Sequence, residues 1–182
     1  MSQERPLPTT SYALLGLLSF GQELTGYELK QFSDSTLRFY WVAPAMSQIY
    51  TELARLDARG LIESRDDADS GARAVRRYRI NAAGLGELRE WLSTSEPEFP
   101  ILKHPVALRL LLGHLVEPST VRKMLQGYLD GLERQRADLQ AVLDSIEGRE
   151  GFTYPSLVAG WGLDYYDAER RSVEDIADRL PE

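Results

Sequence analysis

The 182-residue sequence contains no cysteine and only two histidines. Without cysteine, disulfide bonds, thiolate metal sites and thiol catalysis are excluded, and two imidazoles are too few for a multi-histidine metal site. No segment approaches the roughly 18 apolar residues that a membrane-spanning helix needs, and the first residues lack the apolar core of a signal peptide. We therefore expect a cytoplasmic protein with no cofactor, no bound metal and no membrane partner.

The motifs that mark enzymes are missing as well. His104 precedes a proline and His114 lies in an apolar run, so neither has the sequence context of a nucleophile elbow. Gly84 and Gly86 follow a predicted strand, but the third glycine of a nucleotide-binding fingerprint is absent. We predict that the chain is not an enzyme.

The net charge of −7 at first argues against a nucleic-acid partner. The charge is uneven, however, because residues 1–96 carry 11 Lys and Arg against 13 Asp and Glu, whereas residues 97–182 carry 10 against 15. Arg73, Arg76, Arg77 and Arg79 place four positive charges within seven residues. Phosphates meet a local patch rather than the net charge, so the acidity of the whole chain does not exclude double-stranded DNA as a partner.

Residues 44–80 predict a helix followed by a basic β-hairpin. Pro44 can open a helix, and Gly60 is suited to end it. Between them one helix face is apolar, because Met46, Ile49, Leu53 and Leu56 recur at three- and four-residue steps. The remaining positions, which include Glu52, are predicted to be free to hydrogen-bond. Strand-like runs at 61–65 and 75–80 flank the turn-rich residues 66–74, which predicts the reading half of a winged helix-turn-helix.

Two further helices are expected before this segment. The first covers residues 12–20, with Thr9, Thr10 and Ser11 as candidate caps. The second begins at Thr25, whose spacing to Glu28 is that of a capping box. On this second helix three side chains are predicted to face the core: Tyr27, Leu29 and Phe32.

The connector at residues 36–43 is rich in aromatic side chains, including Trp41. It either packs under the helices or lines a ligand pocket, and we favour packing. A fourth helix is expected from the N-cap Asn81 to about residue 93, with Leu85, Leu88 and Leu92 directed inward. Residues 93–103 contain two prolines and are predicted to separate two domains, 1–95 and 96–182.

The C-terminal half predicts a short apolar helix at 106–115, a long helix that Pro118 opens, and a last helix at 155–180. The long helix carries an apolar seam with alternating steps of four and three, typical of a coiled coil, that Gln135 interrupts. This seam can pack against the last helix or against a second subunit, and we expect both. The predicted dimerisation residues are Val121, Leu125, Tyr128, Leu132, Leu139, Val142 and Ile146. The predicted packing face of the last helix is Val158, Trp161, Tyr165, Ala168, Ser172 and Ile176.

The chemistry of the 44–80 segment points to DNA. The amide of Gln48 can pair bidentately with adenine, and Ser47 and Thr51 can reach a base or a phosphate near the start of the helix. Tyr50 can bind phosphate through its hydroxyl, while Arg55 lies farther along and suits the DNA backbone. The predicted DNA-binding residues are Ser47, Gln48, Tyr50, Thr51, Arg55, Arg73, Arg76, Arg77, Arg79 and Lys30.

Several spaced motifs resemble the PadR family of bacterial transcriptional regulators. They are T-G-Y-E-L at 25–29, S-Q-I-Y-T-E-L at 47–53, L-D-A-R-G-L-I at 56–62 and R-Y-R-I-N-A-A-G at 77–84. The run A-L-R-L-L-L-G-H-L at 107–115 before a long helix resembles the longer branch of that family. The resemblance implies a homodimer, a palindromic operator, and repression that a small, frequently aromatic molecule relieves.

Three departures from the family pattern concern the reading half. Gln48 stands where the family has a small residue and Thr51 where it has proline, so we expect a different operator to be read. Asp66, Asp67 and Asp69 precede the arginines of the wing, and phosphate repels such acids, which argues against DNA contact at the outermost tip.

We therefore predict a mainly α fold, in which an N-terminal winged helix-turn-helix with a two-stranded wing is followed by a C-terminal long-helix dimerisation domain. The predicted function is a DNA-binding repressor that acts as a homodimer. Trp41, Trp161 and Tyr165 are the candidate residues for an aromatic effector, since their rings can stack on a flat ligand. The alternative from a different class is a winged helix that serves as a protein-interaction or assembly module.

Overall fold

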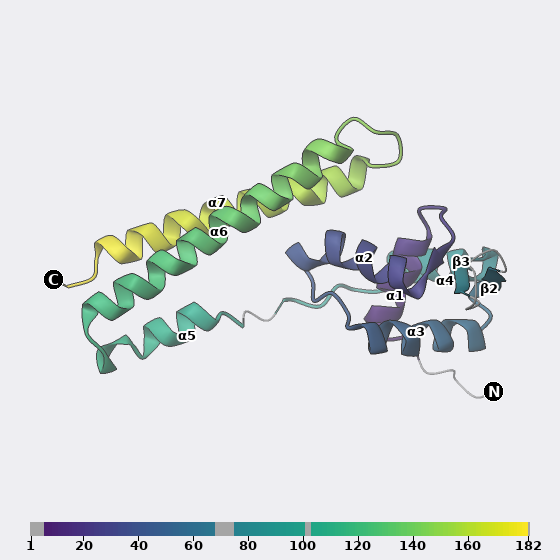
Figure 1. Ribbon diagram of the computed structural model, residues 1–182, viewed down its shortest axis with the longest axis horizontal. Helices are drawn as coiled ribbons and strands as arrows, with labels where there is room; N and C mark the ends of the chain where they lie inside the picture. Colours follow the sequence, from purple (N-terminus) through teal and green to yellow (C-terminus); the bar gives the residue numbers. More distant parts are fainter. Residues whose placement is uncertain (1–5, 68–74, 101–102, 182) are drawn as a thin grey trace. The chain divides into compact units, whose positions relative to one another are not determined.

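The computed structural model describes residues 6–67, 75–100 and 103–181, and it divides the chain into two compact units. We call Met1–Glu98 the head and Phe99–Glu182 the arm. The fold is mainly α with one small sheet, which confirms the predicted fold class. In chain order (Figure 1) the elements are α1 (Thr9–Leu18), β1 (Leu24–Thr25), α2 (Gly26–Thr36), η1 (Leu37–Phe39), α3 (Met46–Ala58), β2 (Ile62–Asp67), β3 (Val75–Ile80), α4 (Ala82–Thr94), α5 (Pro105–Leu111), η2 (Gly113–Leu115), α6 (Pro118–Ile146) and α7 (Thr153–Asp178).

The sheet of the head has three antiparallel strands in the order β1-β3-β2. The β2–β3 pair is the predicted wing. Strand β1 adds two residues to its base, where Leu24 pairs with Tyr78 and Thr25 with Arg77. The sequence does not predict this third strand, because two residues are too few to show a period-two pattern.

Leucine side chains from α1, α2 and α3 fill the core of the head. Ile49, Leu53 and Leu56 are buried, so the apolar face predicted for α3 is confirmed. At the edge of this core the ring of Tyr12 stacks on Trp91, with ring centroids 4.6 Å apart and an interplanar angle of 9°. One aromatic pair therefore joins α1 to α4.

The predicted helix boundaries are partly right. The capping box of Thr25 and Glu28 is present, Asn81 accepts a 2.9 Å hydrogen bond from the Gly84 amide, and Gly60 follows α3 with a φ of +66°. Helix α3 begins at Met46 rather than at Pro44. The predicted caps Thr9, Thr10 and Ser11 are wrong, because Pro8 occupies the N-cap position of α1, all three residues lie within the helix, and Ser11 is buried.

Some predicted core positions are exposed. Tyr27 on α2 and Leu92 on α4 are 60% and 67% exposed, so both predictions were wrong. In the connector Leu37 packs against the core, but Trp41 is 42% exposed and Val42 more so. The preference for packing was therefore wrong for the second half of the connector, because η1 ends at Phe39 and the chain then leaves the core.

Helices α6 and α7 of the arm run side by side as a hairpin (Figure 1). The seam of α6 is buried within the single chain, which is the intramolecular alternative of the sequence analysis. Four seam residues are buried: Val121, Leu125, Leu132 and Leu139. Their part in a second interface, between subunits, stays a prediction.

The predicted packing face of α7 is right for Ile176, which packs against the buried cluster of the arm, but wrong for its aromatic residues. The buried residues of this helix are Ala159, Leu163 and Val173, whereas Trp161 is 74% and Tyr165 50% exposed. The physical reason is the need for close approach between α6 and α7. A Cβ atom placed on Gly162 would lie 2.7 Å from the Cδ2 atom of Leu139, so small residues of α7 face α6 and the bulky rings point outward.

A polar cluster joins α5, α6 and α7. Nδ1 of His104 accepts a 3.1 Å hydrogen bond from the Ala107 amide and caps α5, so the ring hydrogen lies on Nε2. Nε2 lies 2.8 Å from Oε1 of Glu169, to which the Tyr128 hydroxyl also donates at 3.2 Å. Burial, with Glu169 second, raises the pKa of Tyr128 well above its usual value. Tyr128, predicted as a seam residue, thus makes a polar contact between helices.

Within the part of the chain that the structure describes, no helix combines the length and the apolar character needed to cross a membrane.

Candidate nucleic-acid interface

The first two turns of α3 present polar side chains to solvent. Ser47, Gln48 and Thr51, predicted to read DNA, are all exposed. The hydroxyl of Thr51 donates a 2.9 Å hydrogen bond to the carbonyl of Ser47, one turn earlier. The Thr51 oxygen can still accept a hydrogen bond, while the amide of Gln48 can both donate and accept. This surface has the composition that base edges in the major groove require.

Tyr50 lies beside this surface and touches the start of α2. Its side chain is half exposed, and a Cβ atom placed on Gly26 would lie only 2.6 Å from Cε1 of its ring. Gly26 therefore leaves room for the Tyr50 ring between α2 and α3. We did not identify Gly26 from the sequence, where its only signal is its place in the T-G-Y-E-L motif.

A buried carboxylate fixes α3 against α1. Glu52, predicted on the polar face, is only 5% exposed, so that prediction was wrong. Its carboxylate accepts a hydrogen bond from the buried hydroxyl of Ser11 and pairs with the guanidinium of Arg55. Burial of the charge is tolerated because both partners supply hydrogen bonds. The sequence does contain a signal for this burial, because Glu52 lies three residues after Ile49 and four before Leu56, on the same face of the helix.

The two faces of the wing differ in character. Tyr78 is buried and Ile80 partly buried against the core. Arg77 and Arg79 alternate with them on the opposite face, as expected for a strand. Arg65 of β2 lies opposite Arg77 in the register and joins the same face, although it was not among the predicted residues.

Every predicted DNA-binding cation that the structure describes is in an ion pair. Arg73 lies outside the described residues, as does Asp69 of the predicted acidic tip. The other predicted cations form the ion pairs Lys30–Asp34, Arg55–Glu52, Arg76–Asp57, Arg77–Glu28 and Arg79–Glu63. The hydrogen bond that Arg79 donates to Glu63 raises the pKa of Arg79, and the Thr25 amide, with smaller contributions that include Arg77, lowers the pKa of Glu28. The positive charge of the wing is therefore largely compensated within the head.

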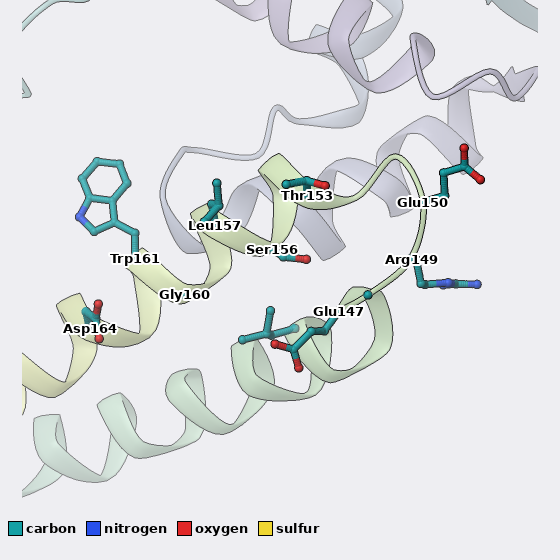
Figure 2. A pocket seen from close by; sticks show the side chains of 11 residues that line it. Glu147, Arg149, Glu150, Thr153, Ser156, Leu157, Gly160, Trp161 and Asp164 are labelled. Carbon is teal, nitrogen blue, oxygen red and sulfur yellow. The ribbon is translucent and has the colours of Figure 1, made fainter.

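The arm carries a separate hollow at the turn between α6 and α7, with a volume of about 830 Å³. Figure 2 shows the Trp161 ring projecting from α7 on the side away from α6. Of the predicted effector residues, Trp161 lines the hollow, Tyr165 lies one turn farther along α7, and Trp41 belongs to the head. Glu147, Glu150 and Asp164 outweigh Arg149 in the lining, so its charge is negative.

Comparison with known proteins supports the fold. Residues 14–90 match the family model described as the transcriptional regulator PadR-like family, and residues 102–180 match the one described as virulence activator alpha C-term. The negative transcriptional regulator PadR of Bacillus subtilis is 27% identical over 135 residues, which cover 74% of this chain and 73% of that protein.

Two solved structures of Bacillus subtilis PadR share the architecture of the chain. The complex with operator DNA has a TM-score of 0.84 at 23% identity and covers 96% of this chain and all of that chain. The complex with p-coumaric acid has a TM-score of 0.74 at 24% identity, with the same coverage. The head and the arm thus match successive parts of one known architecture: residues 14–90 match the PadR-like family of transcriptional regulators, and the helical C-terminal region matches the longer branch of that family.

Proposed function

We propose that the protein is a homodimeric repressor that binds a palindromic operator through α3 and the wing. The observation that carries the proposal is the exposed polar start of α3, which the buried Glu52 holds in a fixed orientation. The relative solved with operator DNA and the relative named a negative regulator support DNA binding and repression. Repression then follows from occupation of a promoter.

The proposed residue roles differ between α3 and the wing. Gln48 reads a base, with Ser47, Tyr50 and Thr51 placing the helix on bases and phosphates. Arg76, Arg77 and Arg79 bind phosphate and so position the head without reading sequence. Lys30 and Arg55 are secondary phosphate contacts, since each already pairs with a carboxylate on its own helix.

Binding to a duplex from the promoter of the protein's own gene, measured at two salt concentrations, tests the proposal. The affinity should fall clearly as salt rises, because phosphate contacts release counterions. Arg77→Ala with Arg79→Ala should weaken binding to every sequence. Gln48→Ala should instead reduce the preference for the promoter over a random duplex by about 1–3 kcal/mol. Equal losses on all sequences would remove Gln48 as the base-reading residue.

We further propose that the second copy docks on exposed apolar faces of the arm. The α6 seam is largely occupied by α7, but the arm leaves large apolar side chains uncovered on two of its helices. On α5 and η2 these are Leu108, Leu111 and Leu115, and on α7 they are Leu157, Trp161 and Tyr165. Exposed apolar clusters of this kind are typical of interaction surfaces. Val142 and Ile146, half-buried on α6, remain proposed contributors.

Sedimentation tests this interface. Trp161→Glu and Leu111→Glu should give monomers with an unchanged helix content, because both side chains are exposed within one chain. The exposed Glu133→Gln on α6 serves as a surface control. A monomeric wild type at micromolar concentration, or variants that dimerise as the wild type does, would contradict the proposed interface.

A small aromatic effector is the last part of the proposal. The relative solved with p-coumaric acid supports a flat ligand, and the exposed rings of Trp161 and Tyr165 can stack on one. The carboxylates around the hollow disfavour an anionic ligand at that place. Two measurements test this step with neutral and with anionic aromatic compounds. One is the quenching of Trp161 fluorescence, and the other is the release of the protein from the promoter duplex.

The compensated arginines favour one alternative, a winged helix that binds protein rather than DNA. Promoter binding that is absent or insensitive to salt would support this alternative over the repressor.

A further inference from the structure

The exposed face of the wing carries arginines and carboxylates in alternation. Glu63 of β2 lies opposite Arg79 of β3, and Arg65 opposite Arg77. Glu23, just before β1, reaches the same face. Together with Ser64 these residues line a hollow of about 360 Å³. The guanidinium groups of Arg65, Arg77 and Arg79 thus share one small surface with the carboxylates of Glu23 and Glu63.

A carboxylate holds each of the three arginines. Nε of Arg79 donates a 2.9 Å hydrogen bond to Oε2 of Glu63, and Nε of Arg65 donates a 2.6 Å hydrogen bond to Oε2 of Glu23. Arg77 donates to Oε2 of Glu28 at 3.1 Å and to the Glu23 carbonyl at 3.2 Å. The side chains of Arg65 and Arg79 remain more than half exposed, so a phosphate can reach them.

We propose that Glu23, Glu28 and Glu63 limit the phosphate affinity of the wing, so that its arginines alone do not hold the protein on non-specific DNA. The inference rests on the proposed DNA-binding function and adds a role for carboxylates that touch no base. Each of them occupies a guanidinium that would otherwise bind the phosphate of any duplex.

The physical basis is an exchange of partners. When a phosphate binds Arg79, the Glu63 carboxylate loses its partner, so one ion pair replaces another and the net gain is small. On a random duplex nothing else offsets this exchange. On the operator, contacts from α3 add to it and binding becomes favourable. The carboxylates therefore lower the phosphate affinity of the wing on every duplex, and only a duplex that also engages α3 is bound tightly.

Neutralising two of the carboxylates provides the test. Glu23→Gln with Glu63→Gln removes the competitors of Arg65 and Arg79 and keeps the side-chain shape. Glu28 is left in place because it also caps α2. The matched control is Glu90→Gln with Glu96→Gln, which changes the net charge equally at exposed positions outside the wing. Full-length proteins are compared on the promoter duplex and on a random duplex of equal length, across a range of salt concentrations.

The Glu23/Glu63 variant should bind the random duplex more tightly by about two- to fivefold for each residue, with a similar gain on the promoter duplex. The slope of log affinity against log salt should steepen by up to about 0.9 for each arginine released. Gains no larger than those of the Glu90/Glu96 control would overturn the inference and leave the proposed function intact. If neither the wild type nor any variant shows salt-dependent binding, the proposed function itself fails.

Discussion

The head and the arm differ in how each of them places one tryptophan. In the head Trp91 stacks on Tyr12 and closes the core, whereas in the arm Trp161 and Tyr165 stand outside the α6–α7 hairpin. The head therefore buries most of its large apolar side chains within one chain. The arm packs leucine and valine side chains between α6 and α7, with a close approach at Gly162, and leaves the rings of Trp161 and Tyr165 exposed. This difference is the reason why we place the second copy and the effector on the arm.

Truncation of a core side chain should have the largest effect, and it should lower the stability of only the unit that contains the side chain. Leu53→Ala should lower the free energy of unfolding of the head by about 2–5 kcal/mol, and Leu139→Ala that of the arm by a similar amount, because both side chains are fully buried. Urea unfolding is followed by tryptophan fluorescence in two variants. The variant with Trp91 as its single tryptophan reports the head, and the variant with Trp161 as its single tryptophan reports the arm. If either substitution shifts both transitions equally, the units unfold together and the comparison fails.

A matched pair of tryptophan substitutions sharpens the same contrast. Trp91→Ala should destabilise the head by about 2–4 kcal/mol, since it removes a stacked and partly buried ring. Trp161→Ala should change the stability of the monomer by less than about 0.5 kcal/mol, while it weakens self-association. Thermal unfolding and sedimentation of the same samples measure the two effects. A strongly destabilised Trp161→Ala monomer would show that this ring belongs to the core of the arm.

The smallest expected effect is the pH dependence that Glu28 contributes to the head. The Thr25 amide hydrogen bond, the largest cause, holds the pKa of Glu28 below its usual value of 4.5. A lowered folded-state pKa gives stability that is present above 4.5 and is lost as the pH falls through the folded value. Glu28→Gln should therefore flatten the acid side of the stability curve of the head. An unchanged curve would show that the capping contact contributes no measurable stability.

Regular patterns account for what could be predicted from the sequence. The apolar face of α3, the capping box at Thr25 and the bounds of β3 follow from periodicity and cap chemistry, and the structure reproduces them. These features are local, so neighbouring residues determine them.

The features that were missed depend on residues far apart in the chain. The burial of Glu52 requires Ser11, 41 positions away. The face of α7 depends on the close approach of Leu139 to Gly162. The compensation of Arg65 by Glu23 joins residues 42 positions apart. The spacing of Glu52 from Ile49 and Leu56 indicates its burial, but the identity of the distant partner leaves no periodic signal in any of the three cases, because only the folded chain brings the partners together.

The pairing of Glu52 with Ser11 and Arg55 has a consequence for how operators diverge. The tilt and roll of α3 are set from inside the protein, by a carboxylate that cannot turn toward solvent without leaving a buried hydroxyl unsatisfied. Under the proposed function, substitutions at Ser47, Gln48 or Thr51 should therefore alter which bases are met while the helix keeps its pose. New target sequences can arise by single exchanges on the outer surface, with no cost to the architecture beneath.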